Sequence, residues 1–372
     1  MRSLLPLRLP LRPALPGDTP GGGRRGRHRG GAGGRRADVN GPRSGRPRVF
    51  TWHVHGTYLY YLCHAACEFY VPVKPGKPEG YGGRAGSMPW PQNLHEIPAE
   101  AVCRQEFDCV LFQSERNYFF DQYEVLSPEQ RRLPRVYLEH NTPASSPTDT
   151  RHAVDDANTL LVHVTYFNRL MWDSGRTPTR VIEHGVLVPE EIGWAGSLAR
   201  GVTVANDVAA RGRRLGWDVF QAAAARVPLD LIGMGSEDIG GLGEMARDRL
   251  LRTLPAYRFF FNPIRYTSLP LSVCEAMALG LPVVGLATTE LARTIENGVS
   301  GYVDTKTEAL IDFMELLVRD RGLAEQLGRG ARERARARFG IERFAQEWTE
   351  TFSEVCGRRP ASPASLTRNG GP

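Results

Sequence analysis

After residue 47, the hydrophobic and polar positions alternate between two kinds of segment. One kind is a short, continuous run of apolar, β-branched or aromatic residues, which is typical of a strand buried on both faces of a parallel sheet. Such strands are predicted at residues 49–54, 108–112, 135–138, 160–164, 181–189, 200–205, 229–232, 258–261 and 282–286. The pattern therefore predicts sheets with mostly parallel strands.

The other kind of segment has apolar residues every three or four positions, which predicts helices with one face on a core. These helices are expected at residues 55–62, 166–172, 272–279, 308–318, 323–339 and 341–355. In the last one, Phe344, Trp348 and Phe352 recur every fourth residue and are expected in the core. Strands that alternate with helices predict an α/β fold with doubly wound sheets.

The loop between strand 258–261 and helix 272–279 holds candidate chemistry. Thr267, Ser268 and Leu269 precede the helix, whose N-terminal N–H groups suit a phosphate. Glu275 lies one turn inside the helix, where a carboxylate can accept hydrogen bonds from the two hydroxyls of a ribose. Together these residues suggest a site for a nucleotide diphosphate.

Three stretches in this region resemble the donor-site segment of GT-B glycosyltransferases, specifically the retaining family 4 group. They are Glu275-Ala-Met-Ala-Leu-Gly-Leu-Pro-Val-Val, Thr289-Glu290 and Glu296-Asn-Gly-Val-Ser-Gly-Tyr-Val. The resemblance implies that Glu275 binds the ribose and that the amides of Thr267, Ser268 and Leu269 hold the diphosphate. A family glutamate that faces the sugar is replaced by Thr267, and the family's Gly-Gly pair is replaced by Thr288-Thr289.

The resemblance also implies two Rossmann-like doubly wound domains that face each other across a cleft. The expected organisation is a disordered Arg/Gly/Pro-rich tail at 1–47, an acceptor domain at 48–189, a donor domain at 190–338, a crossover helix at 339–356 and a disordered tail at 357–372. The strand at 181–189 is expected to link the two domains. It carries Glu183-His184-Gly185 where the family has Pro-Asn-Gly.

Two histidines are the predicted catalytic residues of the acceptor domain. His140 follows strand 135–138, in the place of a family histidine close to the transferred sugar, and His55 follows the first strand. An imidazole can hold a sugar hydroxyl or move a proton near neutral pH. Gly56 and Thr57, next to His55, are predicted to contact the acceptor, because glycine permits a close approach to the backbone.

An arginine cluster after strand 200–205 is the candidate for donor phosphate binding. The family has an Arg and then a Lys in this loop, where this chain has Asn206 and then Arg211, Arg213 and Arg214. A guanidinium binds phosphate bidentately, so Arg214 is our first choice and Arg213 our second. A solvated arginine-rich turn is the alternative. Gly235 resembles the glycine of the family turn that meets the nucleotide base.

Charge and cysteine content limit the partners. Of the net charge of +6, residues 1–48 supply +10, with twelve Arg and two Asp, which leaves −4 for residues 49–372. We therefore expect no specific nucleic-acid partner, and RNA binding by the tail is the alternative. No apolar run approaches the roughly 20 residues of a membrane helix. The six cysteines form no CxxC pair, so we expect no zinc and a cytoplasmic protein.

These observations predict a glycosyltransferase that moves a sugar from a nucleotide-diphosphate donor to a carbohydrate, lipid or small-molecule acceptor. The resemblance implies retention of the anomeric configuration, with no metal and no cofactor besides the donor. Peripheral membrane association is left open. The alternatives are a catalytically degenerate nucleotide-sugar-binding protein and a nucleotide-sugar epimerase. A phosphorylase with a cofactor lysine is disfavoured, because the only lysines are Lys74, Lys77 and Lys306.

Overall fold

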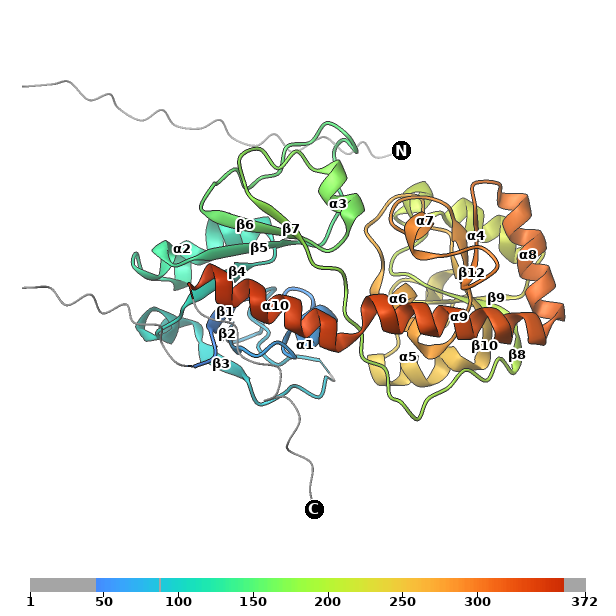
Figure 1. Ribbon diagram of the computed structural model, residues 1–372, viewed down its shortest axis with the longest axis horizontal. Helices are drawn as coiled ribbons and strands as arrows, with labels where there is room; N and C mark the ends of the chain where they lie inside the picture. Colours follow the sequence, from blue (N-terminus) through green and yellow to red (C-terminus); the bar gives the residue numbers. More distant parts are fainter. Residues whose placement is uncertain (1–44, 87, 358–372) are drawn as a thin grey trace, which may run out of the picture. The chain divides into compact units, whose positions relative to one another are not determined.

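The computed structural model describes residues 45–86 and 88–357 and contains two parallel sheets with helices around them (Figure 1). The predicted tail at 1–47 lies outside the described residues except for 45–47. The predicted tail at 357–372 lies outside them except for Gly357.

The N-terminal half holds a seven-stranded sheet with the order β3-β2-β1-β4-β5-β6-β7. Its strands are β1 (Arg48–Thr51), β2 (Glu68–Val73), β3 (Leu94–Pro98), β4 (Cys109–Phe112), β5 (Arg135–Glu139), β6 (Thr159–His163) and β7 (Thr179–Val181). Its helices are α1 (Gly56–Leu62), α2 (Gln122–Val125) and α3 (Tyr166–Met171), with short helical turns η1 (Ala99–Arg104), η2 (Asn117–Asp121) and η3 (Gln130–Arg132). Neighbouring strands run parallel throughout.

The C-terminal half holds a five-stranded parallel sheet with the order β12-β11-β10-β8-β9. Its strands are β8 (Leu198–Val204), β9 (Leu229–Ile232), β10 (Tyr257–Asn262), β11 (Val283–Leu286) and β12 (Gly301–Asp304). Its helices are α4 (Trp217–Ala224), α5 (Arg247–Thr253), α6 (Leu271–Leu279), α7 (Leu291–Thr294), α8 (Thr307–Arg319) and α9 (Arg321–Phe339), with turns η4 (Gly212–Leu215), η5 (Glu237–Ile239) and η6 (Leu254–Ala256). The last helix is α10 (Ile341–Val355).

The continuous apolar runs form buried strands, as predicted. All residues of β10 and β11 are buried, because helices cover both faces of the sheet. Helix α6 ends where the sequence predicted, at Gly280, whose φ of 90° is left-handed and suits glycine. The doubly wound α/β fold with two parallel sheets is therefore confirmed.

Helix α10 packs on the N-terminal half (Figure 1). Trp348 Nε1 donates a hydrogen bond to the Tyr58 hydroxyl over 3.2 Å, and the Phe352 ring lies 6.0 Å from that of Phe69. Phe344, Trp348 and Phe352 are fully buried, so their predicted place in the core is confirmed. The aromatic stripe thus fixes α10 against α1 and the first sheet.

One predicted strand, at 181–189, is wrong for most of its length. Only β7, Thr179–Val181, pairs with the sheet, and residues 182–189 form an irregular linking segment. This segment leaves the sheet because Val186 N donates to Phe339 O over 2.9 Å, at the junction of α9 and α10. Gly185 permits the close approach, since a Cβ atom there would lie 2.3 Å from Phe344.

Strands β2 and β3 were not predicted from the sequence. Pro72 interrupts the apolar run of β2, and proline is uncommon within a central strand. In β3 only Leu94 and Ile97 are buried, because the strand lies at the edge of the sheet. Such short patterns predict a strand only weakly, because the pairing with neighbouring strands that stabilises them is not visible in the sequence.

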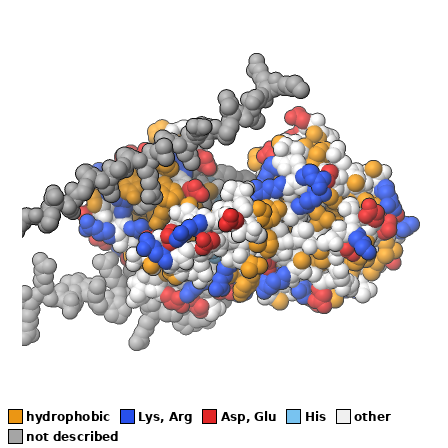
Figure 2. Space-filling model, turned by 90° about the horizontal axis from the view of Figure 1, so that it is seen from above, with side chains coloured by type: hydrophobic (Ala, Val, Ile, Leu, Met, Phe, Trp, Pro, Cys, Tyr) orange, Lys and Arg blue, Asp and Glu red, His pale blue; other side chains and the backbone are white. Residues whose placement is uncertain are grey.

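The surface carries both signs of charge. Figure 2 shows Lys and Arg side chains interspersed with Asp and Glu over the visible face. This mixture agrees with the small net charge of residues 49–372. None of the helices in the described part of the chain is both long enough and apolar enough to span a lipid bilayer.

Candidate active site

A cavity of about 480 Å³ lies between the two sheets, at the carboxyl ends of their strands. In each sheet the strand order reverses once, between β1 and β4 and between β8 and β10. Open α/β sheets bind ligands at such reversals, because the loops on either side diverge there. The loops after β1, β5, β8 and β10 all contribute to the cavity wall.

Most of the predicted site residues line this cavity. From the N-terminal half come His55, Gly56, Thr57 and His140, and from the C-terminal half come Thr267, Ser268, Leu269 and Glu275. The structure thus brings both predicted histidines and the predicted donor segment to one space. Arg213, Arg214 and Gly235 are not part of its lining.

The loop before α6 presents unpaired donors. Within the described part of the chain, the backbone amides of Thr267, Ser268 and Leu269 have no hydrogen-bond partner. The N-terminus of α6 has no side-chain cap, because Pro270 occupies that position, and the buried Ser268 hydroxyl also lacks a partner. Unpaired donors at a helix N-terminus suit an anion such as a diphosphate.

Glu275 holds one carboxylate oxygen fixed and leaves the other open. Its Oε1 accepts a hydrogen bond from the Tyr61 hydroxyl over 2.6 Å and lies 3.4 Å from Arg247 Nε. The Oε2 atom has no partner among the described residues, and the side chain lines the cavity although only 4% of Glu275 is exposed. Burial raises the pKa of Glu275, whereas Arg247 and the Tyr61 hydrogen bond lower it.

The tautomer of His140 follows from its neighbour Gln113. The Gln113 amide nitrogen donates to Thr51 Oγ1 and Trp52 O, each over 3.0 Å, so its Oε1 faces His140 Nε2 at 3.3 Å. A neutral His140 therefore donates from Nε2 and keeps a lone pair on Nδ1. Sequence reasoning named His140 but not the side chain that orients it.

His55 and His140 lie close together in the cavity wall. Their ring centroids are 4.3 Å apart, and the Tyr58 ring packs on His140 at 4.7 Å. Burial lowers the pKa of His140 well below 6.5, and the charge that His55 can carry lowers it further. Burial lowers the pKa of His55 as well, so both imidazoles are neutral near pH 7 and can accept a hydrogen bond from a hydroxyl.

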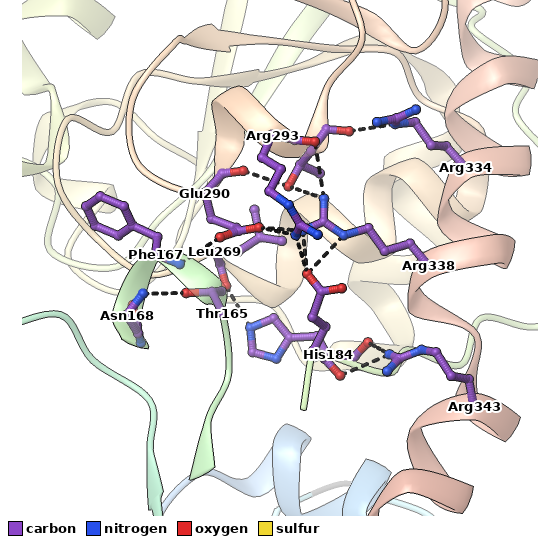
Figure 3. A network of polar contacts seen from close by, with 12 residues as sticks. Thr165, Phe167, Asn168, His184, Leu269, Glu290, Arg293, Arg334, Arg338 and Arg343 are labelled. Carbon is purple, nitrogen blue, oxygen red and sulfur yellow. Dashed lines mark hydrogen bonds and ion pairs between the residues drawn. The ribbon is translucent and has the colours of Figure 1, made fainter. Parts of the chain in front are cut away.

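His184 joins the linking segment to the donor loop, a role that the sequence did not predict. Its Nε2 donates to Leu269 O over 2.9 Å (Figure 3), and its Nδ1 is buried with no partner in the described residues. Burial lowers the pKa of His184 to about 4, so the ring is neutral near pH 7. The only sign of this role in the sequence was that Glu183-His184-Gly185 replaces the family's Pro-Asn-Gly.

The three arginines of the cluster differ in whether protein groups or the cavity surround their side chains. Arg213 pairs with Asp218 over 2.6 Å. Arg214 donates to Tyr266 O over 3.3 Å and to Thr142 Oγ1 over 3.4 Å. The side chain of Arg211 has no partner in the described part of the chain, and it lines the cavity. Phosphate contacts of Arg213 and Arg214 stay predictions, and Arg211 is the better placed of the three.

Gly235 lies in a turn beside the cavity. Its φ of 69° is left-handed, and a Cβ atom there would meet Asp207 Oδ1 at 2.9 Å. Asn206 lines the cavity and accepts from Met234 N over 3.0 Å, which fixes this turn. The predicted contact of Gly235 with a nucleotide base stays a prediction.

Glu290, which the resemblance places in the donor segment, does not line the cavity and belongs to the polar network drawn in Figure 3. It is 2% exposed, accepts from Phe167 N over 3.0 Å, and pairs with Arg338 and with Arg293, the latter over 2.8 Å. Glu183 pairs with the same two arginines. The network therefore joins α3, α7, α9 and the linking segment.

No group of three His, Cys, Asp or Glu side chains with the arrangement of a metal site is found in residues 45–86 and 88–357. Metal independence and the absence of another cofactor stay predictions.

The comparisons with known proteins concern the same region and the fold. Residues 215–320 match the family model for glycosyl transferases group 1. No curated protein matches the sequence. Among solved structures, the chain is similar to sucrose-phosphate synthase from Thermosynechococcus elongatus, with a TM-score of 0.62 and 18% identity over 84% of this chain and 100% of that one.

Two further structures have the same arrangement. A glycosyltransferase from Rickettsia africae ESF-5 has a TM-score of 0.61 and 12% identity over 84% of this chain and 99% of that one. Anabaena Alr3699/HepE in complex with UDP-glucose has a TM-score of 0.59 and 14% identity over 83% of this chain and 100% of that one. At such identities the likeness concerns the fold.

The family match covers the donor loop and Glu275, and with the fold it supports a glycosyltransferase enzyme. The predicted resemblance is thus confirmed: residues 215–320 match the glycosyl transferases group 1 family, and the chain has the GT-B fold with two Rossmann-like domains.

Proposed function

We propose that this protein transfers a sugar from a nucleotide-diphosphate donor to an acceptor bound by its N-terminal half. One observation carries the proposal: unpaired amides, Arg211 and Glu275 line one wall of a cavity whose other wall holds the neutral rings of His140 and His55. The structure of Anabaena Alr3699/HepE, which has the same fold, contains UDP-glucose.

The donor wall would stabilise the departing nucleotide. The amides of Thr267 to Leu269 and the guanidinium of Arg211 would bind the diphosphate, whose negative charge grows as the glycosidic bond breaks. The free Oε2 of Glu275 would accept a hydrogen bond from a ribose hydroxyl. Fixed donors of this kind lower the barrier because they need no reorganisation during the reaction.

The histidine wall would hold the reacting hydroxyl. The lone pair on His140 Nδ1 can accept a hydrogen bond from a sugar or acceptor hydroxyl, and His55 lies beside it. Orienting an acceptor against the anomeric carbon converts a bimolecular step into an effectively unimolecular one. We propose retention of configuration and metal independence on the family 4 resemblance, because protein groups alone would neutralise the leaving diphosphate.

A turnover assay tests the proposal. The purified protein is incubated with UDP- and GDP-sugars and a panel of simple sugar and lipid acceptors, and the release of UDP or GDP is followed by mass spectrometry. We expect release with one donor, unchanged by EDTA, and a product whose anomeric proton coupling matches that of the donor. Binding or release with none of these donors would contradict the proposal.

A second candidate function is binding of a nucleotide sugar without turnover. Thr267 favours it, because this residue stands where the family has a glutamate facing the sugar. The same titration separates the two functions, since calorimetric binding without nucleotide release indicates a binding protein. In that case the Thr267→Glu variant, which restores the family residue, should gain release.

The acceptor and the cellular site complete the proposal. We propose that the acceptor is a carbohydrate, a lipid or a small molecule and that the protein is cytoplasmic. If the acceptor is a lipid, we propose that the protein associates with the membrane surface. Sedimentation with phospholipid vesicles tests the last point, and absence of co-sedimentation together with turnover of a water-soluble acceptor would reject it.

A further inference from the structure

We propose that Tyr61 is a positioning residue that reaches from the N-terminal half to the donor site and holds Glu275 in the orientation that binds the nucleotide. The inference rests on the proposed function, because it assigns a partner to the donor-binding carboxylate. The hydrogen bond from the Tyr61 hydroxyl to Glu275 Oε1 is 2.6 Å long and joins residues 214 positions apart in the chain.

Tyr61 is built to donate this hydrogen bond. It is fully buried in α1, and its oxygen accepts from Arg247 Nη2 over 2.6 Å while its proton goes to Glu275. Burial and the Glu275 charge raise the pKa of Tyr61 well above 10, so the hydroxyl stays protonated across the working range. The hydroxyl thus has one donor and one acceptor partner, and its direction is fixed.

Arg247 completes the support of the carboxylate from the other side. Its Nη2 also donates to Leu187 O, over 2.5 Å, in the linking segment. Its guanidinium carbon lies 5.1 Å from the Tyr61 ring centroid. The Glu275 carboxylate therefore contacts two side chains that are held in turn by α1 and by the segment between the halves.

This arrangement leaves one carboxylate oxygen for a ligand. Because Oε1 is occupied by Tyr61 and Arg247, a ribose hydroxyl would meet Oε2 at the cavity wall. Without the Tyr61 hydroxyl, Oε1 would keep only the longer Arg247 contact of 3.4 Å, and the carboxylate would lose its fixed orientation. Donor affinity would then depend on contact between the two halves of the molecule.

The test compares Tyr61→Phe with Tyr60→Phe. Tyr60 is the neighbouring buried tyrosine of α1, and within the described residues its hydroxyl makes no hydrogen bond to Glu275. Its ring centroid lies 5.4 Å from the guanidinium carbon of Arg247, a contact that Tyr60→Phe keeps, so the control removes the same atom from the same helix. UDP and GDP are titrated by calorimetry from pH 5 to 8. We expect the nucleotide that binds the wild type to bind Tyr61→Phe about tenfold more weakly, the effect of one lost hydrogen bond to a charged group. Tyr60→Phe should bind like the wild type.

The pH profile separates positioning from loss of packing. Tyr61 is one of the groups that lower the pKa of Glu275, so its removal raises that pKa. Binding that needs the carboxylate would therefore weaken at a higher pH in Tyr61→Phe than in the wild type or in Tyr60→Phe. Equal affinities and equal profiles in the two variants would overturn the inference.

A second measurement keeps the inference separate from the proposed function. Tyr61→Phe and Glu275→Gln are combined in a double-mutant cycle, and the unfolding equilibrium is measured without ligand. We expect the two changes to be coupled by about tenfold in the equilibrium constant. If the wild type binds neither UDP nor GDP, the proposed function fails while coupling still supports the Tyr61 contact. Absence of coupling overturns the inference whatever the nucleotides do.

Discussion

Glu183 and His184 are neighbours in the chain, but they belong to two regions with opposite character. Glu183 pairs with Arg293 and Arg338, two of the arginines labelled in Figure 3. His184 lines the cavity and keeps an unpaired nitrogen. In the network the charged groups are matched with one another, whereas in the cavity polar groups are left without protein partners.

This difference separates a structural region from a binding region. A buried polar atom without a partner costs about 1–3 kcal/mol of stability, so such atoms are rare unless a ligand or water completes them. The cavity wall holds such atoms at His184, Ser268 and the donor-loop amides, and others lie elsewhere in the described residues, for example at Asn168 and Arg343. Substitutions in the cavity should therefore cost activity, and substitutions in the network should cost stability.

The largest expected effect is on turnover, at His140. The His140→Ala change removes the imidazole that would orient the reacting hydroxyl, and we expect the rate of nucleotide release to fall by about 10²–10⁴-fold. His53→Ala is the control, because His53 follows β1 at the same edge of the sheet but bonds Gly83 O over 2.6 Å and does not line the cavity. Equal initial rates for the two variants would remove His140 from the mechanism.

The next effect is on stability, at Glu290. Glu290→Gln removes one of the two carboxylates that pair with Arg293 and Arg338 and leaves Glu183 as their only carboxylate partner in the described residues. We expect the free energy of unfolding, measured in urea, to fall by about 3 kcal/mol. Glu296→Gln removes an exposed partner of Arg334 and should cost less than about 1 kcal/mol. Similar losses for both variants would contradict the role of the buried Glu290 pairs in stability.

A smaller effect, on donor affinity, separates the arginines. Arg211→Ala removes the cluster's unpaired guanidinium at the cavity wall, and we expect binding of UDP or GDP to weaken by about 2 kcal/mol in calorimetry. Arg214→Ala removes contacts with Tyr266 and Thr142, so it should lower the melting temperature and change the affinity for UDP or GDP less than Arg211→Ala does. The reverse result would return the phosphate role to Arg214, the first choice from the sequence.

The same contrast explains how much the sequence could predict. The donor wall comes from one continuous segment, so Thr267, Ser268, Leu269 and Glu275 could be read together as a loop and a helix start. The two histidines could be placed because each follows a predicted strand. The carboxyl ends of parallel strands share one edge of a sheet, so the order of the strands along the chain was enough to predict that the two histidines lie at the same edge.

Contacts between distant segments could not be predicted. In the sequence, Tyr61 has the pattern of an apolar residue in an amphipathic helix. No residue near it in the chain predicts its hydrogen bond to Glu275. From the sequence, Gln113 is only the residue that follows a predicted strand, and its contact with His140 is seen only in the structure. The contacts of Arg214 with Tyr266 and Thr142 could not be predicted for the same reason, since both partners lie far from Arg214 in sequence.

The last expected effect is the pH dependence that His184 gives to stability, which is absent near neutral pH. Its pKa is about 4 in the folded protein, below the usual 6.5, so between these values the unfolded chain binds a proton that the native state excludes. The free energy of unfolding should therefore fall as pH drops through this window, by about 1.4 kcal/mol per pH unit from this residue. Above pH 6.5 the contribution is constant.

The His184→Asn change, which restores the family residue, tests this sign. We expect urea unfolding between pH 4.5 and 6.5 to show a slope shallower than that of the wild type by about 1.4 kcal/mol per unit. At pH 7.5 the two proteins should differ by the lost bond to Leu269 O and the lost ring contact with Tyr58. An unchanged slope would mean that the ring is protonated in the native state, and His184 would then belong with the paired charges of the network rather than with the neutral groups of the cavity.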